Sequence, residues 1–234
     1  MKKLCCFLFA FILIFSLSSC TGGNGATDGG QIENHLPCSK DGVAEFVSLA
    51  WDFKGDGLLS GLNVTEDNIY NVTPHQVASQ TDYRIFKAAD SCASFIMIDG
   101  EIYPICEYFG GYGFINAVPC DFDEDGYTDL IVASSFGSGV HRSVISHFNG
   151  RTKESTVVFD TSLTDRPDRD LLIMMATPSF SSVEADNLPI YYNIYTVEIT
   201  ARDGNLAKLS YLPTDVIGGI EYVDGRVVFI SNEK

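Results

Sequence analysis

The chain has 234 residues, of which 45% are hydrophobic and 20% are charged. Such a composition can bury a core, so a chain that is disordered throughout is excluded. Acidic residues outnumber basic ones 31 to 15, and the formal net charge is −16. A surface this negative repels phosphate groups, which excludes nucleic acid as a partner.

The first segment has the layout of an export signal. Lys2 and Lys3 precede an apolar run at residues 4–15, and a short stretch of small residues follows that run. The apolar run is too short to span a bilayer comfortably. We therefore expect residues 1–19 to be a secretory signal peptide.

A cysteine stands where this signal ends. The segment Leu17-Ser18-Ser19-Cys20 resembles the lipobox of bacterial lipoproteins. The resemblance implies cleavage before Cys20 and a lipid on its thiol, so the protein would be exported and anchored to the cell-envelope membrane. An ordinary cleaved signal peptide is the alternative.

A tether and one folded domain are expected after Cys20. Residues 20–37 contain a glycine-rich stretch with few apolar side chains, which is typical of a flexible tether. We expect residues 38–234 to form a single domain. No second apolar stretch is long enough to cross a membrane, so the lipid is the expected membrane contact.

Four cysteines fall in this domain, at Cys38, Cys92, Cys106 and Cys120. An even number in an exported chain permits two disulfides, and buried thiols are the alternative. Cys92 and Cys106 would face each other across a three-residue turn at Asp99-Gly100. A two-residue turn would place them on opposite faces of the sheet.

Two short helices are expected near the start of the domain. Thr73-Pro74-His75-Gln76 has the form of a capping box that opens one of them. Ser39 is a possible cap for the other. That helix is predicted from five apolar residues spaced along one face: Val43, Phe46, Val47, Ala50 and Trp51.

From about residue 83 the pattern favours antiparallel strands. Tyr195, Val197 and Ile199 alternate with polar residues, which predicts a strand with one buried face. Residues 160–170 and 176–189 are predicted to be loops. Asp-Gly or Asn-Gly pairs, which favour tight hairpin turns, separate apolar runs at Asp99-Gly100, Asn149-Gly150, Asp203-Gly204 and Asp224-Gly225.

These patterns predict a mostly β fold. We expect an antiparallel sheet meander of about eight to ten strands, with a small N-terminal helical portion. A simple meander, a sandwich and a partial propeller remain open at this point.

Acidic residues are concentrated in one segment, which begins at Asp121 and ends at Asp129. Acids occupy positions 1, 3, 5 and 9, and Gly126 at position 6 allows a tight turn. Ca²⁺ binds six to eight oxygen atoms, which alternating side chains on a short loop can supply. The spacing therefore predicts a calcium site formed by the side chains of Asp121, Asp123 and Asp125. The Tyr127 carbonyl and Asp129, directly or through water, are expected to complete it.

The segment DFDEDGYTDLIVA resembles the calcium loops of FG-GAP and VCBS repeats, which are found in integrin-type propellers and bacterial surface proteins. The resemblance covers about 30 residues and implies a loop that leads directly into a strand. Position 12 is Val132 in place of the glutamate that closes an EF-hand, which also favours a loop between strands. The chain has one good copy, and Asp52–Gly57 carries Lys54 in place of the second acid.

His141 and Arg142 stand in a second glycine-rich segment, FGSGVHRS. They are possible ligand contacts, and a structural Arg–Asp pair in a tight turn is the alternative reading. Aromatic residues around glycines offer either a sugar-binding platform or ordinary core packing: Tyr108, Phe109, Tyr112 and Phe114.

Three functions are consistent with these features. The first is a non-catalytic binding or interaction module on the cell envelope, braced by calcium, with an envelope protein or a glycan as its partner. The second is a secreted hydrolase, for example glycoside-directed, with dispersed catalytic carboxylates. The third is a structural lipoprotein. The chain contains no Gly-x-Ser-x-Gly, His-Glu-x-x-His or P-loop motif, so we interpret it as a non-enzyme.

Overall fold

The computed structural model describes residues 34–52, 61–91, 93–106, 110–138, 140–163, 170–176, 191–201 and 205–232. The chain separates into two units, Met1–Gln31 and Ile32–Lys234, and all described residues belong to the second. Several predictions fall outside the described residues and stay predictions. They concern the signal peptide, Cys20, most of the tether, the pairing of Cys92, the segment after Asp52, Tyr108, Phe109, the Asp203-Gly204 turn and most of the two long loops.

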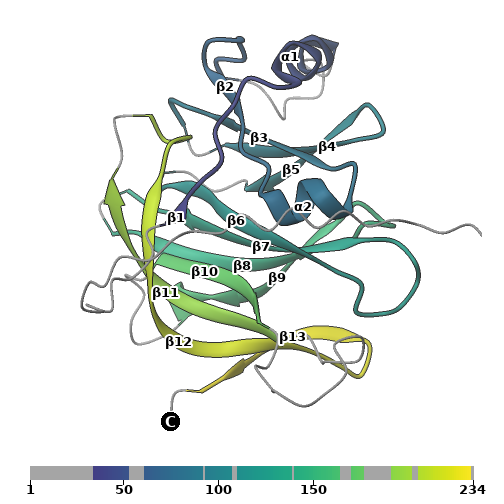
Figure 1. The fold of residues 1–234 in the computed structure, drawn as a ribbon, viewed down its shortest axis with the longest axis vertical. Helices are drawn as coiled ribbons and strands as arrows, with labels where there is room; N and C mark the ends of the chain where they lie inside the picture. Colours follow the sequence, from purple (N-terminus) through teal and green to yellow (C-terminus); the bar gives the residue numbers. More distant parts are fainter. Residues whose placement is uncertain are drawn as a thin grey trace, which may run out of the picture. The chain divides into compact units, whose positions relative to one another are not determined.

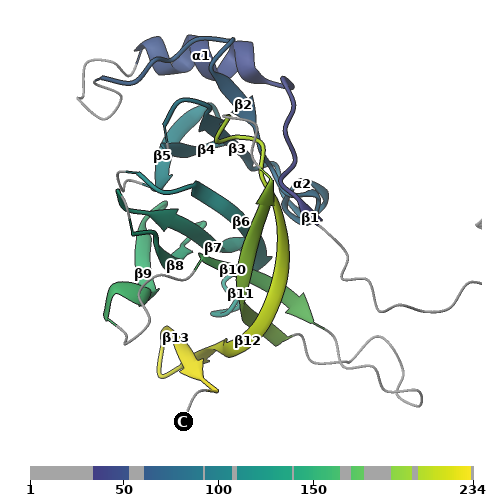
Figure 2. The same ribbon diagram turned by 90° about the vertical axis from the view of Figure 1, so that its left-hand side faces the viewer.

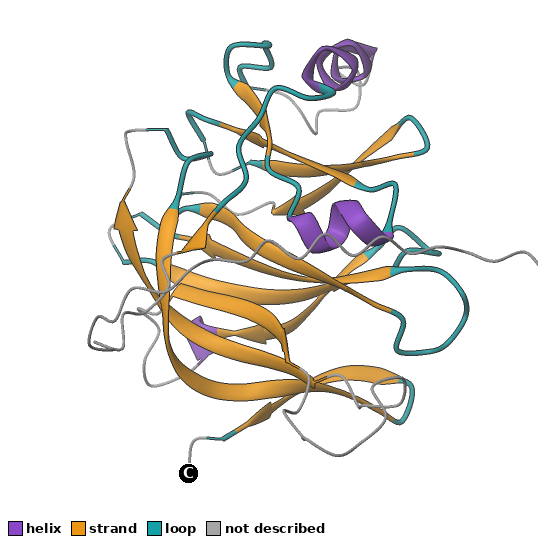
Figure 3. Cartoon of the chain, viewed as in Figure 1, coloured by secondary structure: helices purple, strands orange, loops and turns teal. Residues whose placement is uncertain are grey.

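The described part of the second unit is mostly β, which confirms the predicted fold class (Figure 3). It contains α1 (Val43–Asp52), α2 (His75–Gln80) and the short 3₁₀ helix η2 (Thr161–Leu163). The thirteen strands are β1 (Asn34–His35), β2 (Ile69–Asn71), β3 (Arg84–Ala88), β4 (Ser94–Ile98), β5 (Glu101–Cys106), β6 (Gly113–Cys120), β7 (Asp129–Phe136), β8 (Arg142–Phe148), β9 (Ser155–Asp160), β10 (Asp170–Ala176), β11 (Tyr191–Ala201), β12 (Ser210–Val223) and β13 (Arg226–Ser231).

The strands form three antiparallel sheets (Figure 1). Two of them are four-stranded meanders, β2-β3-β4-β5 and β6-β7-β8-β9, in which each strand pairs with its neighbours in the sequence. This is also the strand order of a propeller blade. The third sheet has the order β1-β12-β11-β10 with β13 paired to β12, and its long strands β11 and β12 are curved (Figure 2). The thirteen strands among the described residues exceed the expected eight to ten, and β1 and β2, with two and three residues, are too short to show a period.

The β2–β5 sheet is covered on both faces. Phe86 and Met97 pack with Phe46 of α1 in one hydrophobic cluster, while Ile85 and Ile96, one residue earlier on the same strands, belong to the main core. Successive residues of a strand point to opposite faces, so the sheet separates these two clusters.

The two meanders are joined by a buried polar contact. Lys87 on β3 is fully buried, and its Nζ donates a hydrogen bond to the carbonyl oxygen of Phe114 on β6 at 3.0 Å. On β7, residues from Asp129 to Ser135 are all buried, because β10 packs against this sheet. The continuous apolar run Leu130–Ala133 in the middle of β7 fits a strand that is covered on both faces.

Two predicted hairpin turns are confirmed. Asp99-Gly100 joins β4 to β5 and Asp224-Gly225 joins β12 to β13. All four residues have positive φ, which is the geometry of a type I′ turn. The β4–β5 turn has two residues, but an irregularity between Ser94 and Phe95 shifts the register so that Ser94 pairs with Cys106.

The predicted hairpin turn at Asn149-Gly150 is present between β8 and β9, but it is longer than two residues. Phe148 pairs with Ser155, so residues 149–154 form the connection between β8 and β9. The Asn149 side chain accepts hydrogen bonds from the backbone N–H groups of Arg151 and Thr152 at 3.0 and 2.8 Å. This Asx-type bonding organises a longer turn.

The predicted helix at 43–52 is confirmed, with one correction. Val43, Phe46 and Ala50 are buried, whereas Trp51 is 54% exposed and does not belong to the buried face. Ser39 is not its cap, because it lies four residues before the helix begins and its hydroxyl accepts a hydrogen bond from the Asp41 N–H, outside the helix.

The second helix forms without the predicted capping box. Pro74 occupies the N-cap position of α2, and no side chain caps the helix. The Thr73 hydroxyl instead bonds with the Asn71 side chain and accepts a hydrogen bond from the Ile85 N–H at 2.8 Å. Within the described residues, neither helix has the length and apolar character needed to cross a membrane.

Candidate metal centre

The acidic segment forms the loop between β6 and β7. Cys120, the last residue of β6, pairs with Asp129, the first residue of β7, so residues 121–128 form the connection. Glu124 and Gly126 have φ values of +55° and +83°. Glycine adopts such angles without steric cost, so Gly126 lets the chain reverse direction within a few residues.

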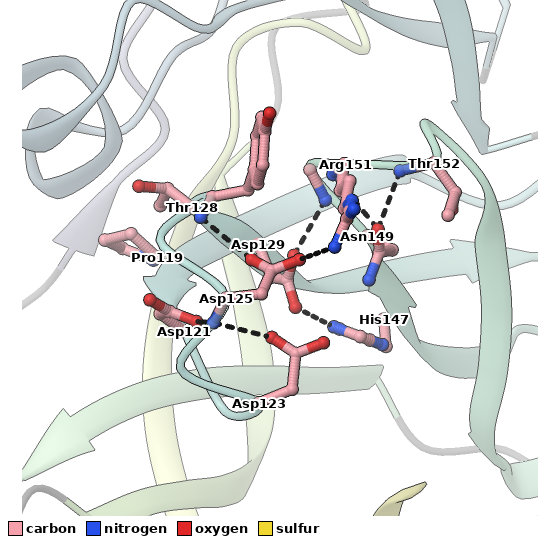
Figure 4. A network of polar contacts seen from close by, with 12 residues as sticks. Pro119, Asp121, Asp123, Asp125, Thr128, Asp129, His147, Asn149, Arg151 and Thr152 are labelled. Atoms are coloured by element: carbon pink, nitrogen blue, oxygen red, sulfur yellow. Dashed lines mark hydrogen bonds and ion pairs between the residues drawn. The ribbon is translucent and has the colours of Figure 1, made fainter. Parts of the chain in front are cut away.

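The three aspartates in this loop converge. Each of Asp121, Asp123 and Asp125 offers a carboxylate oxygen, and these three atoms lie within 4.8 Å of one another (Figure 4). The Asp125 N–H donates to the carboxylates of Asp121 and Asp123 at 3.2 and 3.4 Å. The Gly126 N–H donates to Asp121 at 3.3 Å. The loop backbone therefore holds the carboxylates together through long hydrogen bonds.

Asp129 is held in a different way. His147 Nε2 lies 2.7 Å from Asp129 Oδ2, and the Gly150 N–H donates to Asp129 Oδ1 at 2.7 Å (Figure 4). Its side chain is 2% exposed. Asp129 is not part of the three-carboxylate group, and both of its oxygens have protein partners. Its role as a fourth ligand stays a prediction, as does that of the Tyr127 carbonyl.

The β8–β9 connection lies directly against the end of the acidic loop. A Cβ atom on Gly150 would lie 2.0 Å from the Thr128 carbonyl oxygen, so only glycine fits at this close approach. The same carbonyl accepts a hydrogen bond from the Tyr83 hydroxyl at 2.7 Å. Burial and the neighbouring Asp129 raise the pKa of Tyr83, which keeps this donor protonated.

Arg151 places a positive charge beside the loop. Its guanidinium lies 3.7 Å from the Asp125 carboxylate and 5.8 Å from the ring of Tyr127. The Arg151 side chain is 65% exposed, so solvent screens this pair strongly. Arg151 partly offsets the charge of the aspartates and can move aside.

The donor set fits a hard divalent cation. Carboxylate oxygens are the ligands that Ca²⁺ and Mg²⁺ prefer, and each ionised carboxylate has about four acceptor sites. The hydrogen bonds of 3.2–3.4 Å to Asp121 and Asp123 are longer than the usual 2.9–3.0 Å and leave most of these sites available. Asp121, Asp123 and Asp125 are therefore the residues that would hold a cation.

His141 and Arg142 lie at the opposite end of β8. Arg142 is exposed, while the His141 ring packs edge-on against Tyr112 with centroids 4.5 Å apart. His141 Nδ1 lies 3.9 Å from Asp170 Oδ2. Burial raises the pKa of Asp170, and the nearby hydroxyls of Ser135 and Ser143, together with His141, oppose that shift.

Asp170 is incompletely paired. Asp170 Oδ1 and Ser135 Oγ are buried and have no partner in hydrogen-bonding geometry among the described residues. Of the aromatic residues considered as a sugar platform, Phe114 is fully buried and belongs to the core. The core-packing alternative is therefore confirmed for Phe114.

Sequence reasoning missed His147, Gly150, Arg151 and Asp170 as neighbours of the predicted site residues. Asp129 and His147 lie on paired strands, and their contact depends on the β7–β8 register, in which Ile131 pairs with His147. No local pattern fixes that register. Comparison with protein-family models, with curated proteins and with solved structures finds no match to this chain.

Proposed function

We propose that this protein is an exported lipoprotein, anchored to the cell-envelope membrane through Cys20, whose β domain is a non-catalytic binding module braced by Ca²⁺. The convergence of the Asp121, Asp123 and Asp125 carboxylates within 4.8 Å carries the calcium part of this proposal. The lipobox-like segment ending at Cys20 supports the anchor.

Electrostatics explains why a cation would stabilise this loop. Three carboxylates at such short range repel one another, and Arg151, at 3.7 Å from Asp125 and mostly exposed, offsets that repulsion weakly. A divalent ion at their common centre would turn the repulsion into attraction. Ca²⁺ is favoured over Mg²⁺, because Mg²⁺ demands near-ideal octahedral geometry, whereas Ca²⁺ accepts flexible coordination.

The expected role is structural. Extracellular calcium modules bind with dissociation constants of about 10⁻⁴–10⁻³ M. An ion bound at this loop would fix the turn that leads into β7, where Asp129 and the buried strand begin. The ion would thus order one corner of the sheet, and the core would not depend on it.

Isothermal titration with CaCl₂ tests the proposal. We expect one site with a dissociation constant of about 10⁻⁴–10⁻³ M in the full-length protein. Asp121→Asn and Asp123→Asn should each weaken binding at least tenfold, because each removes a charged ligand. Asp215→Asn is the matched control, since Asp215 is an exposed acid outside the loop. Absence of calcium binding by the parent protein would overturn the proposal.

A test of the anchor is independent of calcium. Metabolic labelling with a radioactive fatty acid should label the protein, and Cys20→Ser should abolish that label. A protein that remains in the membrane fraction without label would contradict anchoring through Cys20.

One observation favours the second candidate, a secreted hydrolase. Among the described residues, Asp170 is a carboxyl group whose pKa is raised by burial, and it lies beside His141 away from the aspartate loop. Raised pKa values are common in catalytic acids. Glycoside hydrolysis needs two carboxyl groups on either side of the substrate, however, and this group is single. The binding module is therefore preferred.

A further inference from the structure

A cleft lies between the β8–β9 connection and the β12–β13 hairpin. Its volume is about 440 Å³, within the range of about 300–1,000 Å³ that is common for small-molecule sites. Asn149 and Thr152 line it from the connection, Thr156 from the adjoining strand β9, and Tyr222 and Arg226 from the hairpin. Asp123 of the aspartate loop also lines the cleft.

The lining offers donors and acceptors close together. Threonine hydroxyls can donate and accept, and Arg226 can only donate. Asn149 Oδ1 already accepts two backbone N–H groups, so its Nδ2 group is the part that can donate to a ligand. A molecule that carries many neighbouring hydroxyl groups, each a donor and an acceptor, matches such a lining. Phosphate compounds do not, because Asp123 and Glu154 also line the cleft.

Tyr222 adds an aromatic surface. Its side chain is 41% exposed. The Phe122 ring stacks against it, with an interplanar angle of 9° and centroids 6.3 Å apart, and Phe122 packs in turn on Tyr192 at 5.0 Å. A ring that is supported from behind and partly open to solvent combines a flat apolar surface with a polar hydroxyl. Sugar rings have apolar C–H faces and polar edges, which suits a surface of this kind.

Two neighbouring residues connect the aspartate loop to the cleft. Phe122 stands between Asp121 and Asp123 in the loop and supports Tyr222, while Asp123 lines the cleft itself. An ion that orders the loop would therefore also fix the position of Phe122, and through it that of Tyr222. A pre-ordered site loses less conformational freedom when its ligand binds.

We propose that this cleft binds a saccharide, with Tyr222 as the stacking surface and Asn149, Thr152 and Arg226 as polar contacts, and that calcium at the aspartate loop strengthens the binding. The inference deepens the proposed function and rests on it for the calcium dependence.

A glycan microarray of neutral and acidic oligosaccharides tests the inference. The full-length protein, labelled with a fluorophore in detergent, is applied in millimolar calcium and in EGTA. We expect a related set of glycans to be bound in calcium. Tyr222→Ala should weaken binding about five- to tenfold, because a stacked aromatic contact is lost. Arg226→Ala should have an effect of similar size.

Matched variants separate binding from folding. Trp51→Ala removes another exposed aromatic side chain, far along the sequence from the cleft, and should leave binding unchanged. Tyr222 and Arg226 are exposed, so thermal melts of their variants should match the parent. An array with no glycan above background, or glycans bound by Tyr222→Ala and Arg226→Ala as strongly as by the parent protein, would overturn the saccharide site.

Calcium titration of the same preparation distinguishes the two proposals. If calcium binds and no glycan is retained, the calcium brace stands and the saccharide inference fails. If calcium does not bind and glycans are retained in EGTA but lost in Tyr222→Ala, the calcium brace fails and the cleft still binds sugar. Equal retention in calcium and EGTA, with calcium bound, would overturn the coupling between loop and cleft.

Discussion

Two histidine–aspartate pairs lie at opposite ends of the β7–β8 strand pair, and they differ in how completely the carboxylate is bonded. Next to the aspartate loop, Asp129 has His147 Nε2 on one oxygen and the Gly150 N–H on the other, both at 2.7 Å. At the far end, Asp170 lies 3.9 Å from His141, and its Oδ1 has no hydrogen-bond partner among the described residues.

The Asp129 pair is a fully hydrogen-bonded structural contact, whereas the Asp170 pair contains a carboxylate oxygen without a hydrogen-bond partner among the described residues. A buried carboxylate with short bonds to two donors stabilises the strands that supply them, because removing it would leave both donors unpaired. A carboxylate that is buried without full hydrogen bonding is held at a cost, and the raised pKa of Asp170 records that cost. Three substitutions and the addition of calcium test this contrast.

The largest expected effect is at the bonded pair. Asp129→Ala should lower the free energy of unfolding by about 3 kcal/mol, because it leaves His147 and the Gly150 N–H without their acceptor. Urea unfolding followed by circular dichroism measures the change. Asp170→Ala is the comparison and should lower the free energy of unfolding clearly less. Equal losses in the two variants would remove the distinction between the pairs.

Calcium should stabilise the protein by binding at the aspartate loop, next to Asp129. At millimolar calcium we expect the free energy of unfolding to rise by about 0.5–1.5 kcal/mol, as mass action predicts for a site of millimolar affinity. The melting temperature should rise by a few degrees. Asp123→Asn should remove the shift, and Asp170→Asn should keep it. A melt that is insensitive to both calcium and EDTA would count against the site.

Asp170→Asn should stabilise the protein at neutral pH, because it removes the cost of keeping a buried carboxyl group ionised. Burial raises the pKa of Asp170 above its unfolded value, so the folded state binds the proton more tightly. The parent is therefore most stable below the unfolded pKa, and it loses stability as the pH rises through the folded pKa. The asparagine variant should lack this loss. Urea midpoints measured from about pH 3 to pH 8 would show it, and parallel profiles for the two proteins would contradict it.

The smallest effect should come from Arg151. Its guanidinium competes with a cation for Asp125, so Arg151→Ala should raise calcium affinity about twofold at low salt. The gain should shrink at high salt, where the charge is screened. Arg142→Ala removes an exposed arginine at the other end of β8 and should leave the affinity unchanged. Weaker calcium binding by Arg151→Ala would indicate that the arginine positions the loop.

Local features were predictable from the sequence. The turns at Asp99-Gly100 and Asp224-Gly225 follow from residues that tolerate positive φ, and the alternation at Tyr195–Ile199 lies within β11. The aspartate loop was also predictable, since its convergent carboxylates come from one short segment.

Features that depend on distant residues were not predictable. The Asp129–His147 contact needs the β7–β8 register, and the His141–Asp170 pair joins the residue before β8 to the first residue of β10, a strand of another sheet. Asn149-Gly150 resembles a two-residue turn, but the Asn149 side chain organises a longer connection that packs against Thr128. Such outcomes are decided by tertiary packing, which overrides local preference.

The bond from Lys87 to the Phe114 carbonyl has a consequence for cooperativity. Separating the β2–β5 and β6–β9 meanders would break this charge-assisted hydrogen bond, which contributes about 1.5–3 kcal/mol, and would expose the apolar core that both sheets share. Partial opening along this seam is thus disfavoured, and we expect amide protons on β3 and β6 to exchange with solvent through a shared, global event.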